Sequence, residues 1–306
     1  LESGKLSPST RGGCPGQEQG GVRIAQFSDC YTPRINGVTT SIRVLKQALE
    51  AEGHEVLLFA PKYRLINPVE ANLHRWSSLY MPLQPEDRAS LLWPPAEVSA
   101  WWRSKVDIIH IHTPFNVGLY GWWKARFQGV PMVFTHHTLW EAYAHYLKIV
   151  PLPVGRWIGR KMCDFYFQQA RAVVMPSLEV EKQLRDSGRV RGRSEVISTG
   201  IYCEQFADGD AGIVHQELGL SRDEPMFLYV GRIGKEKSLD FVVDCFAEYR
   251  GRGGKGCLVI IGGGPETQAL QNQAQSLGVA QEVHFLGYRQ REVLKHYMAA
   301  ARAFLF

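Results

Sequence analysis

Residues 226–240 read Met-Phe-Leu-Tyr-Val-Gly-Arg-Ile-Gly-Lys-Glu-Lys-Ser-Leu-Asp, and this stretch decides the fold class. The first five residues form an apolar run that is typical of a buried parallel strand. A helical spacing of apolar residues follows from Leu239 to Phe246. Arg232, Lys235 and Lys237 therefore lie where a strand is followed by a helix. Because free N–H groups at a helix N-terminus bind anions, these cations indicate a diphosphate site. The alternative is a basic turn exposed to water.

Composition and charge exclude several classes of protein. The chain has 306 residues with Lys+Arg 35 and Asp+Glu 30, which gives a formal net charge of +5. This excess suits an anionic ligand or an anionic membrane surface, but it is too weak to indicate nucleic acid. The cysteines form no C-x-x-C pair, which favours a reduced, cytosolic setting. The sequence contains no apolar run of spanning length and no signal-peptide pattern.

Strand and helix patterns alternate in two series, which predict an α/β protein. Residues 22–198 carry the first series and 226–306 the second. Residues 1–21 read as a disordered tail, 199–225 as a linker without strong periodicity, and 61–105 as a less regular, proline-containing stretch. Two such series predict two doubly wound, Rossmann-like domains that face a cleft, with the second domain incomplete. The predicted strands are 22–28, 55–60, 106–112, 131–135, 172–175, 195–198, 226–230, 257–261 and 283–286, and the predicted helices are 39–52, 117–127, 155–170, 179–187, 239–249, 266–277 and 291–301.

Several short motifs recur in a specific order and spacing over residues 22–306. They are Phe27-Ser28-Asp29, Asn36-Gly37-Val38-Thr39-Thr40-Ser41-Ile42, Gly53-His54-Glu55-Val56, Ile109-His110-Ile111-His112, Thr199-Gly200-Ile201, the segment 231–237 and Gly262-Gly263-Gly264-Pro265. With these motifs the chain resembles the retaining glycosyltransferases of family four, which have the GT-B fold. Thr135–Glu141, together with Tyr143, His145 and Tyr146, resembles the diacylglycerol glucosyltransferase branch. Related mannosyl transfer to lipid acceptors uses similar motifs.

The resemblance implies an enzyme that moves a hexose from a nucleotide sugar, such as UDP-glucose or GDP-mannose, to a membrane lipid such as diacylglycerol. It implies no metal and no further cofactor, and a peripheral location at the cytosolic face of the membrane. The family carries a Glu-x7-Glu segment after the strand that begins here at Ala303. The sequence ends before that segment, so we expect an incomplete donor site. The alternative is a truncated, non-catalytic chain that binds an anionic ligand or a membrane surface.

The resemblance assigns Arg232 and Lys237 to the donor diphosphate. An arginine can grip two oxygens at once, and a lysine supplies a compact second charge. Such preorganised cations stabilise a departing diphosphate. Lys235 matches no family position, and we interpret it as a surface lysine.

Two glycine segments are predicted to lie near the donor. Gly37 lets a ligand approach the backbone closely, and the resemblance brings this loop, flanked by Asn36, to the donor phosphate. The alternative is an ordinary Asn-Gly turn. Gly264 belongs to a strand–glycine–helix junction that serves packing or nucleotide approach. This junction lacks the dinucleotide fingerprint, which argues against a dehydrogenase.

His137 follows the predicted strand 131–135, and the resemblance implies a catalytic histidine that contacts the sugar. An imidazole can donate a hydrogen bond to a sugar hydroxyl. Glu141, four residues on, either orients His137, binds the acceptor hydroxyl or is a surface residue. His110 and His112 share one strand face near His137 and would allow a metal site, but no cysteine or carboxylate spacing supports one.

A basic, aromatic segment suggests contact with a membrane. Arg156, Arg160 and Lys161 accompany Trp157 on one predicted helix, and such helices lie on anionic surfaces. The alternative is that the apolar stripe of this helix packs on the sheet of the first domain. The stripe consists of Val154, Trp157, Ile158, Met162 and Phe165, and Trp101, Trp102, Trp122 and Trp123 add aromatic pairs.

Overall fold

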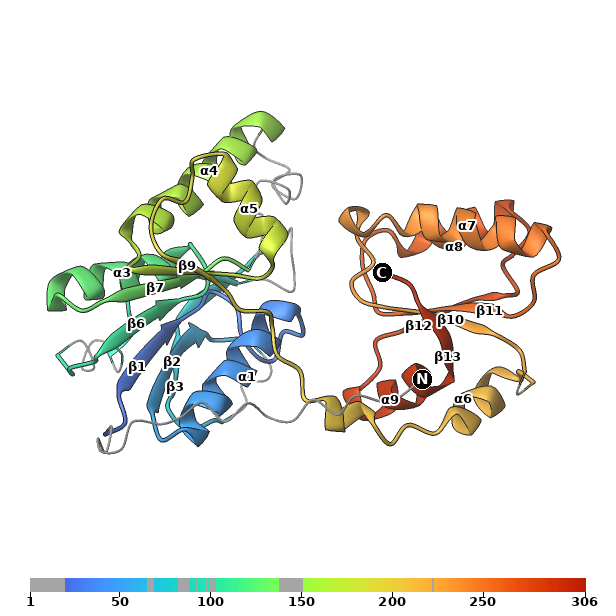
Figure 1. Ribbon diagram of the computed structural model, residues 1–306, viewed down its shortest axis with the longest axis horizontal. Helices are drawn as coiled ribbons and strands as arrows, with labels where there is room; N and C mark the ends of the chain where they lie inside the picture. Colours follow the sequence, from blue (N-terminus) through green and yellow to red (C-terminus); the bar gives the residue numbers. More distant parts are fainter. Residues whose placement is uncertain are drawn as a thin grey trace, which may run out of the picture. The chain divides into compact units, whose positions relative to one another are not determined.

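The chain forms two compact units, residues 1–200 and 201–306, in the computed structural model. The structure describes residues 20–64, 69–81, 88–91, 93–96, 98, 103–137, 151–221 and 223–306. In each unit a parallel sheet lies between layers of helices (Figure 1). None of the described helices is both long and apolar enough to cross a bilayer.

The first unit is built on a seven-stranded parallel sheet in the order β3-β2-β1-β6-β7-β8-β9. A separate antiparallel pair joins β4 and β5. The strands are β1 (Arg23–Phe27), β2 (Glu55–Pro61), β3 (Leu73–Trp76), β4 (Ser78–Tyr80), β5 (Arg88–Ser90), β6 (Ile108–Ile111), β7 (Met132–Thr135), β8 (Ala172–Met175) and β9 (Ser194–Val196), and the helices are α1 (Gly37–Ala51), α3 (Asn116–Gln128), α4 (Leu152–Gln169) and α5 (Leu178–Asp186).

Helices cover both faces of this sheet because successive strand residues point to opposite sides. Phe59 belongs to the core under α3, α4 and α5, where it stacks on Phe27. The preceding residue, Leu58, packs instead against Ile42 of α1 on the other face. Both faces are therefore apolar, which explains the continuous apolar runs of the strands.

The second unit repeats the design with a four-stranded parallel sheet in the order β12-β11-β10-β13. One core joins α7 and α8 to the sheet and a second core joins α6 and α9 to its other face (Figure 1). The strands are β10 (Met226–Val230), β11 (Cys257–Ile261), β12 (Val283–Gly287) and β13 (Ala301–Phe304), the helices are α6 (Ala211–Leu218), α7 (Leu239–Gly251), α8 (Thr267–Ser276) and α9 (Arg291–Ala300), and the short 3₁₀ turns are η2 (Cys203–Phe206) and η3 (Lys235–Lys237).

The stretch 199–225 differs from the predicted linker because much of it is folded. It contains η2 and α6, and Val214 of α6 is completely buried in the second unit. The hydroxyl of Tyr297 on α9 donates to Glu217 at 2.7 Å and ties the two helices together. The linker prediction failed because α6 is short, so the apolar periodicity of one helix had little length in which to show.

The stretch 61–105 is also more regular than expected, since it supplies β3 and the β4–β5 pair. β3 reads Leu-His-Arg-Trp and lies at the edge of the sheet, where only Trp76 is buried. An edge strand of this kind lacks the apolar run by which the central strands were predicted.

Candidate functional site

The first unit has a topological switch point between β1 and β6, where the strand order reverses. Open parallel sheets bind ligands at such points, beyond the carboxyl ends of the strands. The loop after β1 leads into α1, which Asn36 caps by accepting a hydrogen bond from the Thr39 N–H at 2.8 Å. Gly37 begins the helix, and a Cβ added there would meet no described atom within 4 Å. Packing within the unit therefore does not require a glycine at this position.

Asp29 is partly buried at the same switch point and connects its two loops. Its carboxylate accepts hydrogen bonds from the Thr113 hydroxyl at 2.8 Å and from the Val117 N–H at 2.9 Å. It thereby caps α3, whose own N-cap residue makes no side-chain bond. Burial raises the pKa of Asp29 to about 6. The sequence analysis placed Asp29 in a motif but assigned it no role. Its position directly after a predicted strand could have indicated a site residue.

Histidines form a band of packed rings at the ends of β6 and β7. Nδ1 of His112 lies 3.0 Å from Nε2 of His137, and the two rings are nearly parallel. The His110 ring lies 4.1 Å from that of His112, between ring centroids, and its Nε2 lies 2.7 Å from the Thr135 hydroxyl. His136 points to the opposite face, where its ring meets Phe167 edge-on.

These histidines are neutral at physiological pH because burial disfavours their charged form. Burial lowers the pKa of His136 and of His137 to about 4, and that of His110 to about 3. The pKa of His112 is also well below its ordinary value, through burial and then its histidine neighbours. Among the described residues, no group of three or more potential ligand side chains is arranged to hold a metal ion.

The second unit has its switch point between β10 and β13, directly beside the basic segment. Arg232 follows β10, and its carbonyl accepts a hydrogen bond from the Tyr229 hydroxyl at 2.8 Å. Lys237 ends η3, and its Nζ lies 4.5 Å from the ring centroid of Phe306 beyond β13. Ser238 then adopts a left-handed conformation (φ 48°) and leaves the N-terminus of α7 without a side-chain cap. Two cations and an uncapped helix N-terminus thus occupy one strand-to-helix junction.

Glycines let the two loops of this site approach each other. A Cβ at Gly264 would lie 2.0 Å from the carbonyl oxygen of Ile233, so only glycine fits there. Gly262 has φ +136°, and a Cβ on it would lie 1.9 Å from the Gly231 oxygen. The Ile233 N–H donates to the Gly263 carbonyl at 3.0 Å and closes the pair of loops. Gly264 therefore has a packing role that Gly37 lacks.

Comparison with known protein families agrees with the division of the chain into two units. The profile described as Glycosyltransferase Family 4 matches residues 35–205, more than half of the chain. The chain belongs to glycosyltransferase family 4. A second profile, Glycosyl transferases group 1, matches residues 199–306. The boundary between the two profiles lies near the boundary between the two units.

Relatives of this glycosyltransferase chain include two enzymes named alpha-monoglucosyldiacylglycerol synthase. The one from Streptococcus pneumoniae is 31% identical over 91% of this chain and 64% of its own length. The one from Acholeplasma laidlawii is 28% identical over 93% of this chain and 74% of its own length. A GDP-mannose-dependent alpha-mannosyltransferase from Corynebacterium glutamicum is 26% identical over 82% of this chain and 59% of its own length. The chain thus spans less than two thirds of the first of these relatives.

Solved glycosyltransferase structures share the fold. Sucrose-phosphate synthase from Thermosynechococcus elongatus superimposes with a TM-score of 0.69 at 21% identity, over 92% of this chain and 74% of that one. Anabaena HepE in complex with UDP-glucose gives a TM-score of 0.64 at 16% identity, over 92% and 73%. The prediction of two Rossmann-like units of the GT-B class is confirmed.

The structure groups the predicted glycosyltransferase residues by unit. Asn36, Gly37 and His137 lie around the switch point of the first unit, and Arg232, Lys237 and Gly264 around that of the second. Lys235 is exposed. Glu141 lies outside the described residues, as do Trp101, Trp102, Tyr143, His145 and Tyr146.

The proposed membrane residues of α4 are all on its exposed side. Arg156, Trp157, Arg160 and Lys161 face solvent, and Trp157 is 60% exposed. The alternative that the apolar stripe packs on the sheet is wrong for its first half, since Val154 and Ile158 are exposed too. The small residues Gly155, Gly159 and Cys163 form the buried side instead. The buried positions of this half are thus glycines, and its larger side chains are exposed.

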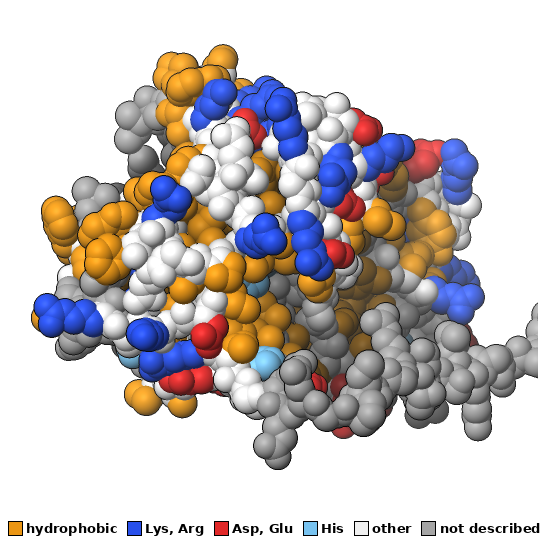
Figure 2. Space-filling model, turned by 60° about the vertical axis from the view of Figure 1, so that its left-hand side comes forward, with side chains coloured by type: hydrophobic (Ala, Val, Ile, Leu, Met, Phe, Trp, Pro, Cys, Tyr) orange, Lys and Arg blue, Asp and Glu red, His pale blue; other side chains and the backbone are white. Residues whose placement is uncertain are grey.

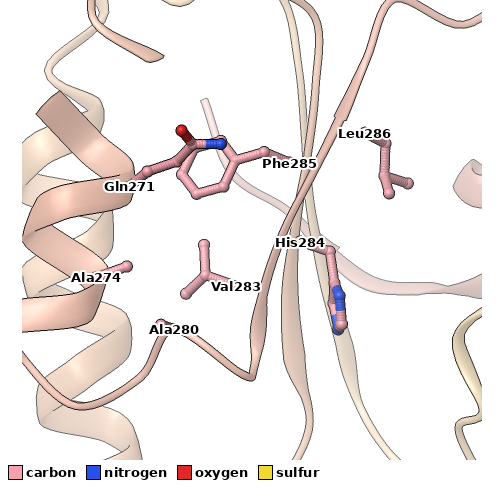
Figure 3. Close-up of a pocket in the computed structure, with 7 residues that line it drawn as sticks. All are labelled: Gln271, Ala274, Ala280, Val283, His284, Phe285 and Leu286. Atoms are coloured by element: carbon pink, nitrogen blue, oxygen red, sulfur yellow. The ribbon is translucent and has the colours of Figure 1, made fainter. Parts of the chain in front are cut away.

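A pocket of about 320 Å³ in the second unit lies away from the basic junction. Figure 3 shows Val283 and Phe285 of β12 pointing toward Gln271 and Ala274 of α8, with His284 on the other side of the strand. None of the predicted site residues lines this pocket.

The free energy of unfolding of the first unit is expected to fall as the pH drops from about 7 to about 4. An unfolded histidine takes up its proton near 6.5, whereas His136 and His137 do so at about 4. The unfolded chain therefore binds more protons in this window, and acid favours unfolding. Asp29 opposes the trend because its raised pKa of about 6 makes the native state bind a proton first. The effect of this single carboxyl group is smaller than the combined effect of His110, His112, His136 and His137.

Tryptophan fluorescence during urea unfolding measures this dependence, because all 8 tryptophans lie in the first unit. His136→Phe supplies the control, since both ring nitrogens of His136 lack a hydrogen-bond partner among the described residues. We expect this variant to lose about 2 kcal/mol less stability between about pH 7 and about pH 5. An unchanged pH dependence in His136→Phe would contradict the pKa of about 4.

Proposed function

We propose that the chain carries the two substrate sites of a retaining hexosyltransferase that moves a hexose from a nucleotide sugar to a membrane lipid such as diacylglycerol. The second unit binds the donor, UDP-glucose or GDP-mannose, and no metal takes part. The names of the two synthases that share 31% and 28% identity support this acceptor class. Labelled hexose from either donor should enter a lipid extract and not a water-soluble product.

Arg232 and Lys237 stabilise the departing diphosphate in this proposal. They lie at the switch point of the second unit, next to the uncapped N-terminus of α7. Charge that develops on the leaving group is then met by donors that are already in place. In the same proposal His137 of the first unit contacts the sugar, and the open space at Gly37 admits the donor phosphate.

The observation that carries the lipid acceptor is a row of exposed apolar side chains on α3. Leu119, Trp123 and Phe127 recur every four residues and are 44%, 53% and 68% exposed. Phe115 continues the row toward the carboxyl ends of the strands, where the site lies and where Asp29 caps the helix. The opposite side of α3 is buried in the core, so this row gives the helix a second, exposed apolar side that suits contact with lipid.

α4 adds a second surface of the same kind, with charge. Exposed Val154, Trp157 and Ile158 accompany the cations of that helix. Figure 2 brings the side of α3 to the front, and hydrophobic side chains reach the surface there in groups with Lys and Arg among them. Apolar contact and attraction to anionic lipids together bind proteins at membrane surfaces. A peripheral position at the cytosolic face of a membrane follows from the proposal, and the free thiols of Cys30, Cys163, Cys203, Cys245 and Cys257 fit it.

Vesicles rich in anionic lipid are expected to bind the protein more tightly than neutral vesicles, and salt should weaken the difference. Each cation near the surface contributes about 1 kcal/mol. The combined substitutions Arg156→Glu, Arg160→Glu and Lys161→Glu should therefore release the protein, as measured by sedimentation with vesicles.

The matched control reverses three exposed cations elsewhere, Arg191→Glu, Arg193→Glu and Arg252→Glu, with the same change in net charge. This control should keep its binding. Replacing Leu119, Trp123 and Phe127 with Ser should weaken binding to both kinds of vesicle. Equal binding of the wild type to both kinds, or equal effects of the two charge reversals, would argue against a membrane role of α4.

Gly37→Ala and Gly264→Ala make the same chemical change with opposite expected results. Gly264→Ala should destabilise the second unit by about 1–3 kcal/mol, because the Cβ would overlap the Ile233 carbonyl. Gly37→Ala should leave stability unchanged or slightly higher, since alanine favours a helix, but should lower kcat/KM for the donor by about tenfold. Calorimetric unfolding and donor kinetics measure the two effects. A Gly37→Ala variant that is destabilised but has normal donor kinetics would show that Gly37 is not part of the donor site.

A further inference from the structure

His112 holds the ring of His137 from within the first unit. The nitrogens Nδ1 of His112 and Nε2 of His137 are 3.0 Å apart, which is a hydrogen-bond distance. His112 is only 2% exposed, and the His110 ring packs 4.1 Å from it on another side. His110 is itself held by Thr135 at 2.7 Å. His112 is therefore fixed in place, while His137 is the one member of this band that is only partly buried.

The direction of this hydrogen bond follows from the other nitrogen of His112. Two neutral imidazoles can share a hydrogen bond only if one supplies the N–H and the other a lone pair. Nε2 of His112 is buried and has no partner among the described residues. A buried N–H without an acceptor is rarer and costlier than a buried lone pair without a donor. The proton of His112 therefore lies on Nδ1, and this N–H donates to Nε2 of His137.

We propose that His112 is a positioning residue that fixes His137 in the tautomer with its proton on Nδ1. His137 then offers an N–H donor, and not a base, to a hydroxyl of the transferred sugar. His112 transfers no proton and touches no substrate, since it acts only through the ring that it orients. This inference rests on the proposed role of His137 in transfer.

Three substitutions at His112 separate this role from simple packing. Asn places an amide nitrogen near the position of Nδ1, Gln places one near Nε2, and Phe keeps the ring without a donor. We expect His112→Asn to keep kcat within a few-fold of the wild type. His112→Gln and His112→Phe should lower kcat by about 10–100-fold, with a smaller change in the donor KM. Losses of this size are typical when the hydrogen-bond partner that orients a functional histidine is removed.

The tautomer itself can be observed by nitrogen-15 NMR of the histidine rings in the whole protein. We expect His137 to carry its proton on Nδ1 in the wild type and in His112→Asn, and to gain the Nε2–H form in His112→Phe. A wild-type His137 protonated on Nε2, or an unchanged tautomer in His112→Phe, would overturn the inference. If His137→Ala leaves transfer intact, the proposed role of His137 in catalysis is wrong. The NMR result would still decide whether His112 sets the tautomer of His137.

Discussion

Arg232→Ala and Lys237→Ala are each expected to lower kcat for hexose transfer by about 10²–10³ while leaving the fold intact. Both side chains are partly exposed at the junction of β10 and α7, so neither contributes to a core. Their charges would be met by the leaving diphosphate, and this interaction is strongest in the transition state. The measurement is kcat with the nucleotide sugar at saturation, together with calorimetric unfolding of each variant.

Lys235→Ala is the matched control for these two variants. Lys235 lies in the same short 3₁₀ turn as Lys237 and carries the same charge, but it is exposed and matches no functional position. Its replacement should leave kcat within about twofold, because exposed charges contribute little. Near-native turnover in both Arg232→Ala and Lys237→Ala, or an equal loss in all three variants, would remove the diphosphate site from this junction.

His137→Ala is expected to abolish transfer while leaving nucleotide binding largely unchanged. His137 belongs to the first unit, at the end of β7, whereas the proposed nucleotide site belongs to the second. Calorimetric titration with UDP and GDP measures binding separately from catalysis. A loss of nucleotide affinity as large as the loss of transfer would place His137 at the nucleotide and not at the sugar.

Most helices and strands of the fold could be predicted because their signals are local. The parallel strands are buried on both faces and read as apolar runs, as in Met226–Val230, and the helices between them keep their periodicity. Elements without such a signal were missed, among them the edge strand β3, the β4–β5 pair and the short helix α6. The two glycine positions also looked alike in sequence. Only the loop contacts show that Gly264 is required for packing and that Gly37 is not.

The site itself depends on strand order, which no local pattern contains. β1 and β6 are neighbours in the sheet although 80 residues of other structure separate them, and this brings Asp29 to the N-terminus of α3. The pairing of β6 with β7 likewise brings His112 to His137 across 25 positions. The side of α4 that is buried could not be predicted from the sequence either, because the apolar stripe and the glycine positions both recur with a helical period. In the structure Gly155 and Gly159 are buried and Trp157 is exposed.

The stereochemistry of the transferred sugar distinguishes retaining transfer to a lipid from the other possible outcomes. The whole protein is incubated with UDP-glucose or GDP-mannose and with vesicles that contain diacylglycerol, and the lipid extract is analysed by NMR. We expect a lipid-linked hexose whose anomeric configuration is that of the donor, formed without added metal. A hexose of inverted configuration, or transfer only to water-soluble acceptors, would contradict this expectation.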